Sequence, residues 1–469
     1  MRLLLIAYDF PPVPSPQSLR WAYLARELAL AGHEVHVLAP DIDGYGGGGL
    51  PVLPDTLMIH RVWPGPLTGY LTLRHRKRRS AMRTVDAGAD VASMPSAVTV
   101  QLNWKGKLRR RIEDGLSARL GHGLNWKGHA MEAIKRVMSL PLFPDSRAEW
   151  QPWAKRRLRE LLDQYQPDVV ISSHEPAMTI ELGALARKNG YPWVADLGDP
   201  VLAPYTPRRW RKRALATERM LCARADLVTV TSDHAREVLR NRHKIGEERC
   251  AILTQGFDHR EVVARDTSVS FDDGKLELLY TGSFYSFRRI GALLEAVLAV
   301  SSVRLSVATI IAPPELIAAA RRHPDRIRLL GFIPHSQAVA LQRRCDVLVN
   351  LANENPVQVP GKFFEYLGSG TPILHIGGAE NDFAARLLRH SGGGWCEPDD
   401  PALLQSRLAS LAEGKARDGK VPSVAGTDFD VMQYSWKNLS QRLVELISSR
   451  MPATAEVAAN PLTNDARTI

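Results

Sequence analysis

Short apolar runs alternate with stretches of helical periodicity along most of the chain. Residues 3–7 predict a strand buried on both faces, residues 17–31 carry apolar side chains at helical spacing, and residues 34–38 predict a second strand. The same alternation resumes at residues 168–172 and again at residues 276–281. Strands that alternate with helices are typical of sheets covered by helices. The pattern therefore predicts an α/β protein with two successive units.

A change of composition marks the expected domain boundaries. The segment 255–273 is polar and lacks clear periodicity, so we expect the first domain to span residues 1–255 and the second to span residues 256–430. Residues 431–450 predict a final helix. Residues 451–469 contain few bulky side chains and predict a loose tail.

The first domain is interrupted by a basic segment, about residues 70–150, that lacks strand signals. It contains the block Arg-His-Arg-Lys-Arg-Arg at 74–79, and the sequence Leu-Asn-Trp-Lys-Gly occurs at both 102–106 and 124–128. Two interpretations stay open. Basic helices that carry Trp suit the surface of an anionic bilayer, whereas a solvated helical insert packed on the first domain needs no partner. Nucleic acid is not expected, because no recognised binding module surrounds the basic residues.

Composition and charge narrow the class of protein. The chain has 469 residues and a formal net charge of +11, which favours acidic partners such as a phosphorylated substrate or an anionic membrane. Its four cysteines are far apart, so neither a disulfide framework nor a zinc site is indicated, and a cytoplasmic location is expected. The apolar run at residues 3–8 is too short for a signal peptide. No run approaches the roughly 20 apolar residues of a membrane-spanning helix.

Two segments of the second domain have the pattern of anion-binding sites. At 360–374, Pro360 and Gly361 predict a helix start, and the first turn carries the cation Lys362 and the carboxylate Glu365. Free N–H groups and a cation at a helix start attract phosphate, and a carboxylate accepts hydrogen bonds from sugar hydroxyls. The alternative is an ordinary exposed ion pair on a capped helix.

The second anion-site pattern follows the strand predicted at 276–281. Gly282 and Ser283 end this strand, and Arg288 and Arg289 lead into the next helix. In the first domain, no G-x-G-x-x-G loop follows the first strand, so a dinucleotide cradle is not supported there. His174 ends another buried strand, at the sheet edge where open α/β sheets bind ligands. A lone histidine is more often structural than catalytic.

Four motifs together resemble a known family. Gly-His-Glu-Val-His-Val-Leu at 32–38, Ser-His-Glu-Pro at 173–176, Tyr-Thr-Gly-Ser at 280–283 and Pro-Gly-Lys-Phe-Phe-Glu-Tyr-Leu-Gly-Ser-Gly-Thr-Pro at 360–372 are similar to the retaining GT-B glycosyltransferases of family 4. The resemblance implies two Rossmann-like domains that face each other across a cleft. It also implies that the nucleotide sugar binds mainly to the C-terminal domain, the acceptor binds to the N-terminal domain, and the final helix crosses back to the N-terminal domain.

The resemblance also implies roles for individual residues. Glu365 would hydrogen-bond the ribose, Lys362 and Arg289 would neutralise the diphosphate, and His174 would reach the reacting sugar. The segment Leu-Gly-Phe-Ile at 330–333 would contact the base. The residues expected to be catalytic are His174, Arg289 and Lys362. Those expected to bind the donor are Gly282, Ser283, Arg288, Arg289, Phe332, Lys362 and Glu365. Those expected to contact the acceptor are Ser15, Gln17 and His174. No metal and no cofactor are expected.

Three positions depart from the family pattern. Val357 stands where the family has the first glutamate of a pair, and Glu354 or Asn355 is a candidate replacement. Ser283 stands where many members have arginine, for which Arg288 is a candidate substitute. The first loop has Pro-Ser-Pro-Gln at 14–17 in place of a Gly-Gly pair. An inactive homologue is therefore one alternative.

The resulting prediction is a cytoplasmic hexosyl- or N-acetylhexosaminyltransferase at the inner face of the cell membrane. It would move a sugar from a nucleoside-diphosphate sugar to a lipid-linked or polysaccharide acceptor, with retention at the anomeric carbon. The sequences at 143–145 and 195–200 resemble members that make bacterial surface polysaccharides such as exopolysaccharide. The alternatives are a GT-B sugar-nucleotide epimerase and a non-catalytic homologue that binds nucleotide sugar or membrane.

Overall fold

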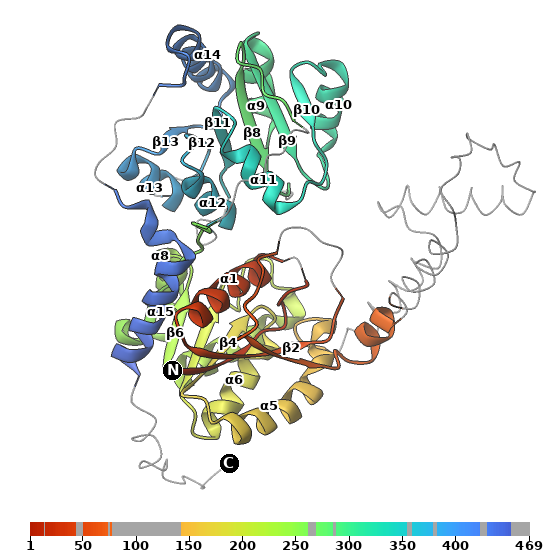
Figure 1. Cartoon of the computed structure of the whole chain (residues 1–469), viewed down its shortest axis with the longest axis vertical. Helices are drawn as coiled ribbons and strands as arrows, with labels where there is room; N and C mark the ends of the chain where they lie inside the picture. Colours follow the sequence, from red (N-terminus) through yellow and green to blue (C-terminus); the bar gives the residue numbers. More distant parts are fainter. Residues whose placement is uncertain are drawn as a thin grey trace, which may run out of the picture.

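The computed structural model describes residues 1–13, 15–43, 50–73, 76, 142–260, 269–284, 288–353, 359–378, 382–422 and 429–451. Two α/β units are stacked along the long axis of the molecule, and each contains a parallel sheet covered by helices (Figure 1). The predicted α/β architecture of two Rossmann-like units is confirmed. The predicted Trp-bearing repeats at 102–106 and 124–128 and the departure at Val357 lie outside the described residues, as do most of the 74–79 block and of the tail.

The first unit contains a seven-stranded sheet in the order β3-β2-β1-β4-β5-β6-β7. Its strands are β1 (Arg2–Ile6), β2 (Glu34–Pro40), β3 (Met58–Val62), β4 (Val169–His174), β5 (Trp193–Leu197), β6 (Leu227–Val230) and β7 (Cys250–Ile252). Its helices are α1 (Pro16–Leu30), α5 (Gln151–Tyr165), α6 (Met178–Lys188), α7 (Arg211–Arg224) and α8 (Asp233–His243), with 3-10 turns at Ser146–Trp150, Arg208–Trp210 and Glu247–Arg249.

Strand β1 is buried on both faces because helices pack on each side of the sheet. Leu3 and Leu5 lie in a core cluster with apolar residues of α1, whereas Leu4 and Ile6 lie in a separate cluster with residues of α5 and α6. Successive side chains of a strand point to opposite faces, so a strand covered on both sides must be apolar throughout. This arrangement explains the continuous apolar run in the sequence.

The second unit contains a six-stranded sheet in the order β10-β9-β8-β11-β12-β13. Its strands are β8 (Leu276–Thr281), β9 (Val303–Ala308), β10 (Ile327–Leu329), β11 (Val347–Leu351), β12 (Ile373–Ile376) and β13 (Gly394–Glu397). Its helices are α9 (Gly291–Ala299), α10 (Pro314–Arg322), α11 (His335–Gln342), α12 (Gly361–Ser369), α13 (Phe383–Ser391) and α14 (Pro401–Asp418).

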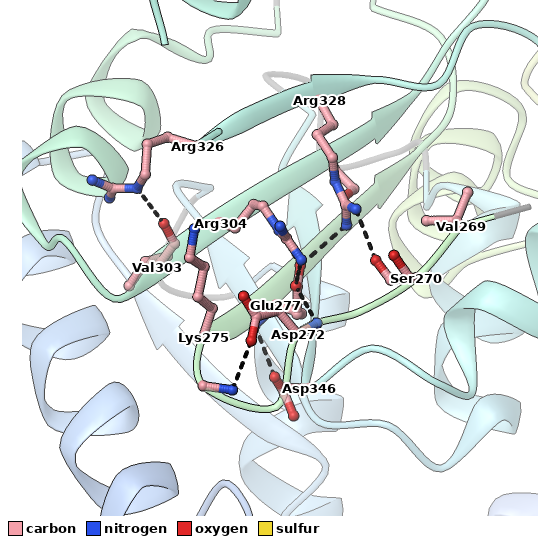
Figure 2. Close-up of polar contacts among 12 residues, drawn as sticks. Val269, Ser270, Asp272, Lys275, Glu277, Val303, Arg304, Arg326, Arg328 and Asp346 are labelled. Atoms are coloured by element: carbon pink, nitrogen blue, oxygen red, sulfur yellow. Dashed lines mark hydrogen bonds and ion pairs between the residues drawn. The ribbon is translucent and has the colours of Figure 1, made fainter. Parts of the chain in front are cut away.

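A buried carboxylate joins the amino-terminal ends of three strands in this unit. Figure 2 shows Arg304 of β9 and Arg328 of β10 reaching Glu277 of β8, whose side chain is 1% exposed. The backbone N–H of Asp272 donates to the same carboxylate at 2.8 Å. A buried charge needs such partners, since its desolvation is otherwise costly. The network holds the amino-terminal ends of these strands together. The candidate site lies at the opposite, carboxyl-terminal ends of the strands.

The last helix, α15 (Trp436–Arg450), returns to the first unit after a 3-10 turn at Val431–Tyr434. It runs along the lower unit in Figure 1, and its apolar residues share a core cluster with α1. The Trp436 ring stacks on Tyr23 with 5.8 Å between ring centroids. Phe257 pairs with Ser435 through an isolated β-bridge, so two crossing segments of the chain are hydrogen-bonded where the units meet.

Candidate functional site

Lys362 lies against the glycine that follows β8. Gly282 has a φ of +146°, and a Cβ atom at this position would be 3.2 Å from Lys362 Cδ and 3.3 Å from Cε. Glycine is therefore favoured here both by the backbone conformation and by the close approach of the lysine. The structure thus brings together two predicted donor-binding residues from separate segments, at the carboxyl end of the sheet.

Arg288 braces the loop that follows β8. Its guanidinium donates to the Ser283 carbonyl oxygen at 3.0 Å and to Asn353 Oδ1, beyond the end of β11, at 2.9 Å. Arg289 is exposed, and no partner for its guanidinium is found within the described ranges. Of the two adjacent arginines, Arg288 has a role in holding the loop, while Arg289 presents a cation to solvent.

Glu365 is an ionised carboxylate held from one side by a histidine. It lies at the middle of α12, its side chain is 19% exposed, and its Oε1 is 3.1 Å from His335 Nε2. The other oxygen, Oε2, is buried without a hydrogen-bond partner among the described residues. Burial alone would raise the pKa of Glu365, but the charges of His335 and Lys362 lower it to about 2. Glu365 is therefore a hydrogen-bond acceptor over the physiological pH range.

An exposed aromatic side chain lies at the same carboxyl-terminal end of the sheet. Phe332 follows β10, and 63% of its surface is exposed. Gly331 before it has a φ of +67°, a left-handed conformation that favours glycine. The predicted base-binding segment therefore offers both an exposed ring and accessible backbone to a ligand.

In the first unit, Gln17 and His174 are in contact. The Gln17 side chain donates to the His174 carbonyl oxygen at 2.7 Å, and a Cβ atom at Gly198 would collide with Gln17 Nε2. His174 is 5% exposed, and burial lowers its pKa to about 4, so its imidazole is neutral near pH 7. Ser15 uses its hydroxyl to cap α1, accepting from the Ser18 N–H at 3.0 Å.

A cluster of charged side chains, Asp9, Asp145 and Arg147, lies near His174 and was not predicted from the sequence. Arg147 pairs with Asp145 at 2.8 Å and approaches Asp9 to 3.7 Å. Burial raises the pKa of Asp9, Arg147 opposes this rise, and Glu175 adds to it. A polar residue soon after a buried strand, as Asp9 is three positions after the end of β1, is the signal that could have identified this cluster. The segment that carries Arg147 is distant in sequence and gave no such signal.

A small pocket lies between the two units. Its lining residues come from both units and from the returning helix: Tyr23, Phe257, Asp258, His335, Val339, Arg343, Glu365, Gly368, Ser369 and Trp436. Glu365 and His335 belong to this lining, so the carboxylate faces the junction of the units. Among the described residues, no group of three or more His, Cys, Asp or Glu side chains is placed to hold a metal ion.

Comparisons with known proteins agree with this architecture. Residues 118–261 match the model of Glycosyltransferase Family 4. Sucrose-phosphate synthase from Thermosynechococcus elongatus superposes with a TM-score of 0.58 at 14% identity, covering 98% of this chain and 100% of that one. The chain is a glycosyltransferase of the GT-B fold. WaaG, a glycosyltransferase involved in lipopolysaccharide biosynthesis, has a TM-score of 0.50 at 12% identity, with 95% of this chain and 100% of WaaG covered.

These comparisons confirm the predicted similarity to family 4 glycosyltransferases. No curated protein matches the glycosyltransferase in sequence. Among its described helices, none is both long enough and apolar enough to cross a membrane.

Proposed function

We propose that the glycosyltransferase moves a sugar from a nucleoside-diphosphate sugar to a lipid-linked or polysaccharide acceptor, with retention at the anomeric carbon. The observation that carries the proposal is the position of Lys362. Its side chain lies against Gly282, and the ionised Glu365 follows three residues later on the same helix. A cation next to a helix start suits a diphosphate, and a buried carboxylate beside it suits the ribose hydroxyls.

Lys362 and Arg289 would act on the leaving group. The bond from the anomeric carbon to the diphosphate oxygen breaks, and negative charge grows on the diphosphate as it departs. Cations fixed at this position favour the transition state over the ground state. The acceptor hydroxyl forms the new bond on the same face of the sugar, and its proton passes to an oxygen of the departing diphosphate. These two cations supply the charge stabilisation, so the proposal includes no metal.

His174 would contact the donor sugar or the acceptor hydroxyl from the opposite unit. Its neutral imidazole can both donate and accept a hydrogen bond, and Gln17 holds its backbone in place. The charged cluster of Asp9, Asp145 and Arg147 lies nearby and would contribute to the acceptor side.

We further propose a role in bacterial surface-glycan synthesis at the inner face of the membrane. The sequences at 143–145 and 195–200 support the first part, and the shared fold of WaaG is compatible with it. The membrane contact is proposed for the basic segment of residues 70–150. Tyr70 and Leu73, at its start, are 58% and 45% exposed. Neutralising the arginines and lysine of residues 74–79 should release the protein from anionic vesicles, and unchanged vesicle binding would contradict the contact.

The test of transfer is turnover of labelled UDP-, GDP- and dTDP-sugars with a polyprenyl-diphosphate sugar as acceptor. Lys362→Ala should lower kcat by roughly 100-fold or more, as loss of a transition-state contact does. Glu365→Ala should mainly raise the donor KM. Lys420→Ala and Glu413→Ala remove exposed charges of the same unit and should match the wild type.

Two outcomes would contradict transfer. Conversion of the donor sugar without glycosylated lipid would indicate an epimerase. Absence of turnover with every donor, together with unchanged cellular glycan in both site variants, would indicate a non-catalytic homologue.

A further inference from the structure

His335 is a neighbour of Glu365 that the sequence motifs do not include. It is the first residue of α11, and it follows directly on the loop that exposes Phe332. Its Nε2 lies 3.1 Å from Glu365 Oε1. An ionised carboxylate can only accept hydrogen bonds, so Nε2 must carry the hydrogen in this contact.

The two carboxylate oxygens of Glu365 differ in their hydrogen bonds. Oε1 is engaged by His335, whereas Oε2 is buried and makes no hydrogen bond of normal geometry among the described residues. The Gln342 side chain is also a neighbour of this carboxylate and helps to lower its pKa. A buried acceptor without a donor is costly in the free protein, and a ligand hydroxyl that donates to it removes this cost. Without His335, the carboxylate could rotate about its last torsion and lose the orientation that presents Oε2.

We propose that His335 is a positioning residue that fixes Glu365 for the ribose hydroxyls and so makes nucleotide binding depend on an intact ribose. The inference rests on the nucleotide site of the proposed function. It adds a residue that touches no reacting atom and acts through Glu365. It also links two parts of the site, because His335 is joined in sequence to the segment expected to contact the base.

The experiment measures a ratio of affinities by isothermal titration calorimetry. The probes are UDP, GDP and dTDP, together with the 2′-deoxy and 3′-deoxy analogues of whichever ribonucleotide binds more tightly. The wild type should bind the ribonucleotide roughly 10-fold or more tightly than the deoxy analogue that lacks the contacted hydroxyl, as expected for a hydrogen bond to a charged group. In His335→Ala this ratio should fall to roughly 1 to 3, mainly through weaker binding of the ribonucleotide.

Two further variants separate positioning from a general structural effect. His335→Gln places an amide donor near the position of Nε2 and should restore most of the ratio. His323→Ala removes an exposed histidine at the end of α10, away from Glu365, and should keep the wild-type ratio. A variant that merely destabilises the unit would weaken both nucleotides equally and leave the ratio unchanged.

The possible failures are distinguishable. If the wild type binds none of UDP, GDP and dTDP, the proposed function fails and the inference fails with it. If it binds dTDP alone, which lacks the 2′-hydroxyl, the proposed function stands and the inference is overturned. If the wild type prefers the ribonucleotide and His335→Ala keeps that preference, the inference alone is overturned. Equal binding of ribonucleotide and deoxy analogues by the wild type would overturn the ribose role of Glu365 and the inference, while the diphosphate site would stand.

Discussion

Replacing Gly368 with alanine should test how α12 is held against the junction between the units. A Cβ atom at this position would lie within 3.0 Å of Cγ, Cδ2 and Cβ of Phe257. The Phe257 ring is 6% exposed and cannot swing into solvent. Its backbone is also fixed, because its N–H donates to the Tyr434 carbonyl at 3.1 Å and its carbonyl accepts from the Trp436 N–H at 3.0 Å.

Two opposing free-energy terms set the expected size of the effect. Alanine is better than glycine in a helix by about 1 kcal/mol. An extra methyl group in a well-packed site costs about 1–3 kcal/mol, and the rigid ring with its fixed backbone favours the upper end. We therefore expect Gly368→Ala to lower the free energy of unfolding by about 2 kcal/mol, which corresponds to a fall in Tm of about 4–8 °C for a unit of this size.

Thermal unfolding followed by circular dichroism measures this change, with Gly291→Ala as the matched control. Gly291 is also helical and in the same unit, but a Cβ atom there would meet nothing within 4 Å. The control should be between unchanged and about 1 kcal/mol more stable. If Gly368→Ala were as stable as Gly291→Ala, Phe257 would not pack on α12 as described, and the reasoning would be refuted.

Two further predictions concern buried ionisable groups. Burial lowers the pKa of His174 to about 4, against an ordinary value of 6.5, so the unfolded chain binds the proton first as the pH falls. From this histidine alone, the free energy of unfolding should drop by about 2 kcal/mol between pH 8 and pH 5. Urea titrations at both pH values measure this drop, and the free energy of unfolding of His174→Gln should fall by that much less than the wild type's. An equal fall in the two proteins would contradict the buried, neutral state of His174. Asp196 pairs with Arg20 at 2.9 Å, both almost fully buried, so Asp196→Ala should cost about 3–5 kcal/mol in urea unfolding. Asp418→Ala breaks an exposed pair and should leave the urea-unfolding midpoint nearly unchanged, and equal losses in the two variants would count against the buried network.

The sequence by itself determined the class of fold and part of the site. The continuous apolar run at residues 3–7 requires a strand covered on both faces, and the structure has helices on each side of β1. The helix start around Lys362 and the strand end at Gly282 were also identifiable, because local signals such as proline, glycine and apolar periodicity act over a few residues. The edge strands β3, β7 and β13 were not predicted, since β3 and β13 are only half buried and β7 has three residues.

Only the tertiary structure decided which distant residues share the site. His335 and Glu365 are 30 positions apart, and Asp9 precedes the basic segment of residues 70–150 whereas Arg147 lies near its end. Pairs of this kind depend on how strands are ordered and where helices cross, and no local pattern encodes that order. The same holds for Gly368, which is an unremarkable helical glycine until the chain crosses between the units and places the Phe257 ring against it. Local chemistry thus gave the parts of the site, and long-range packing selected their partners.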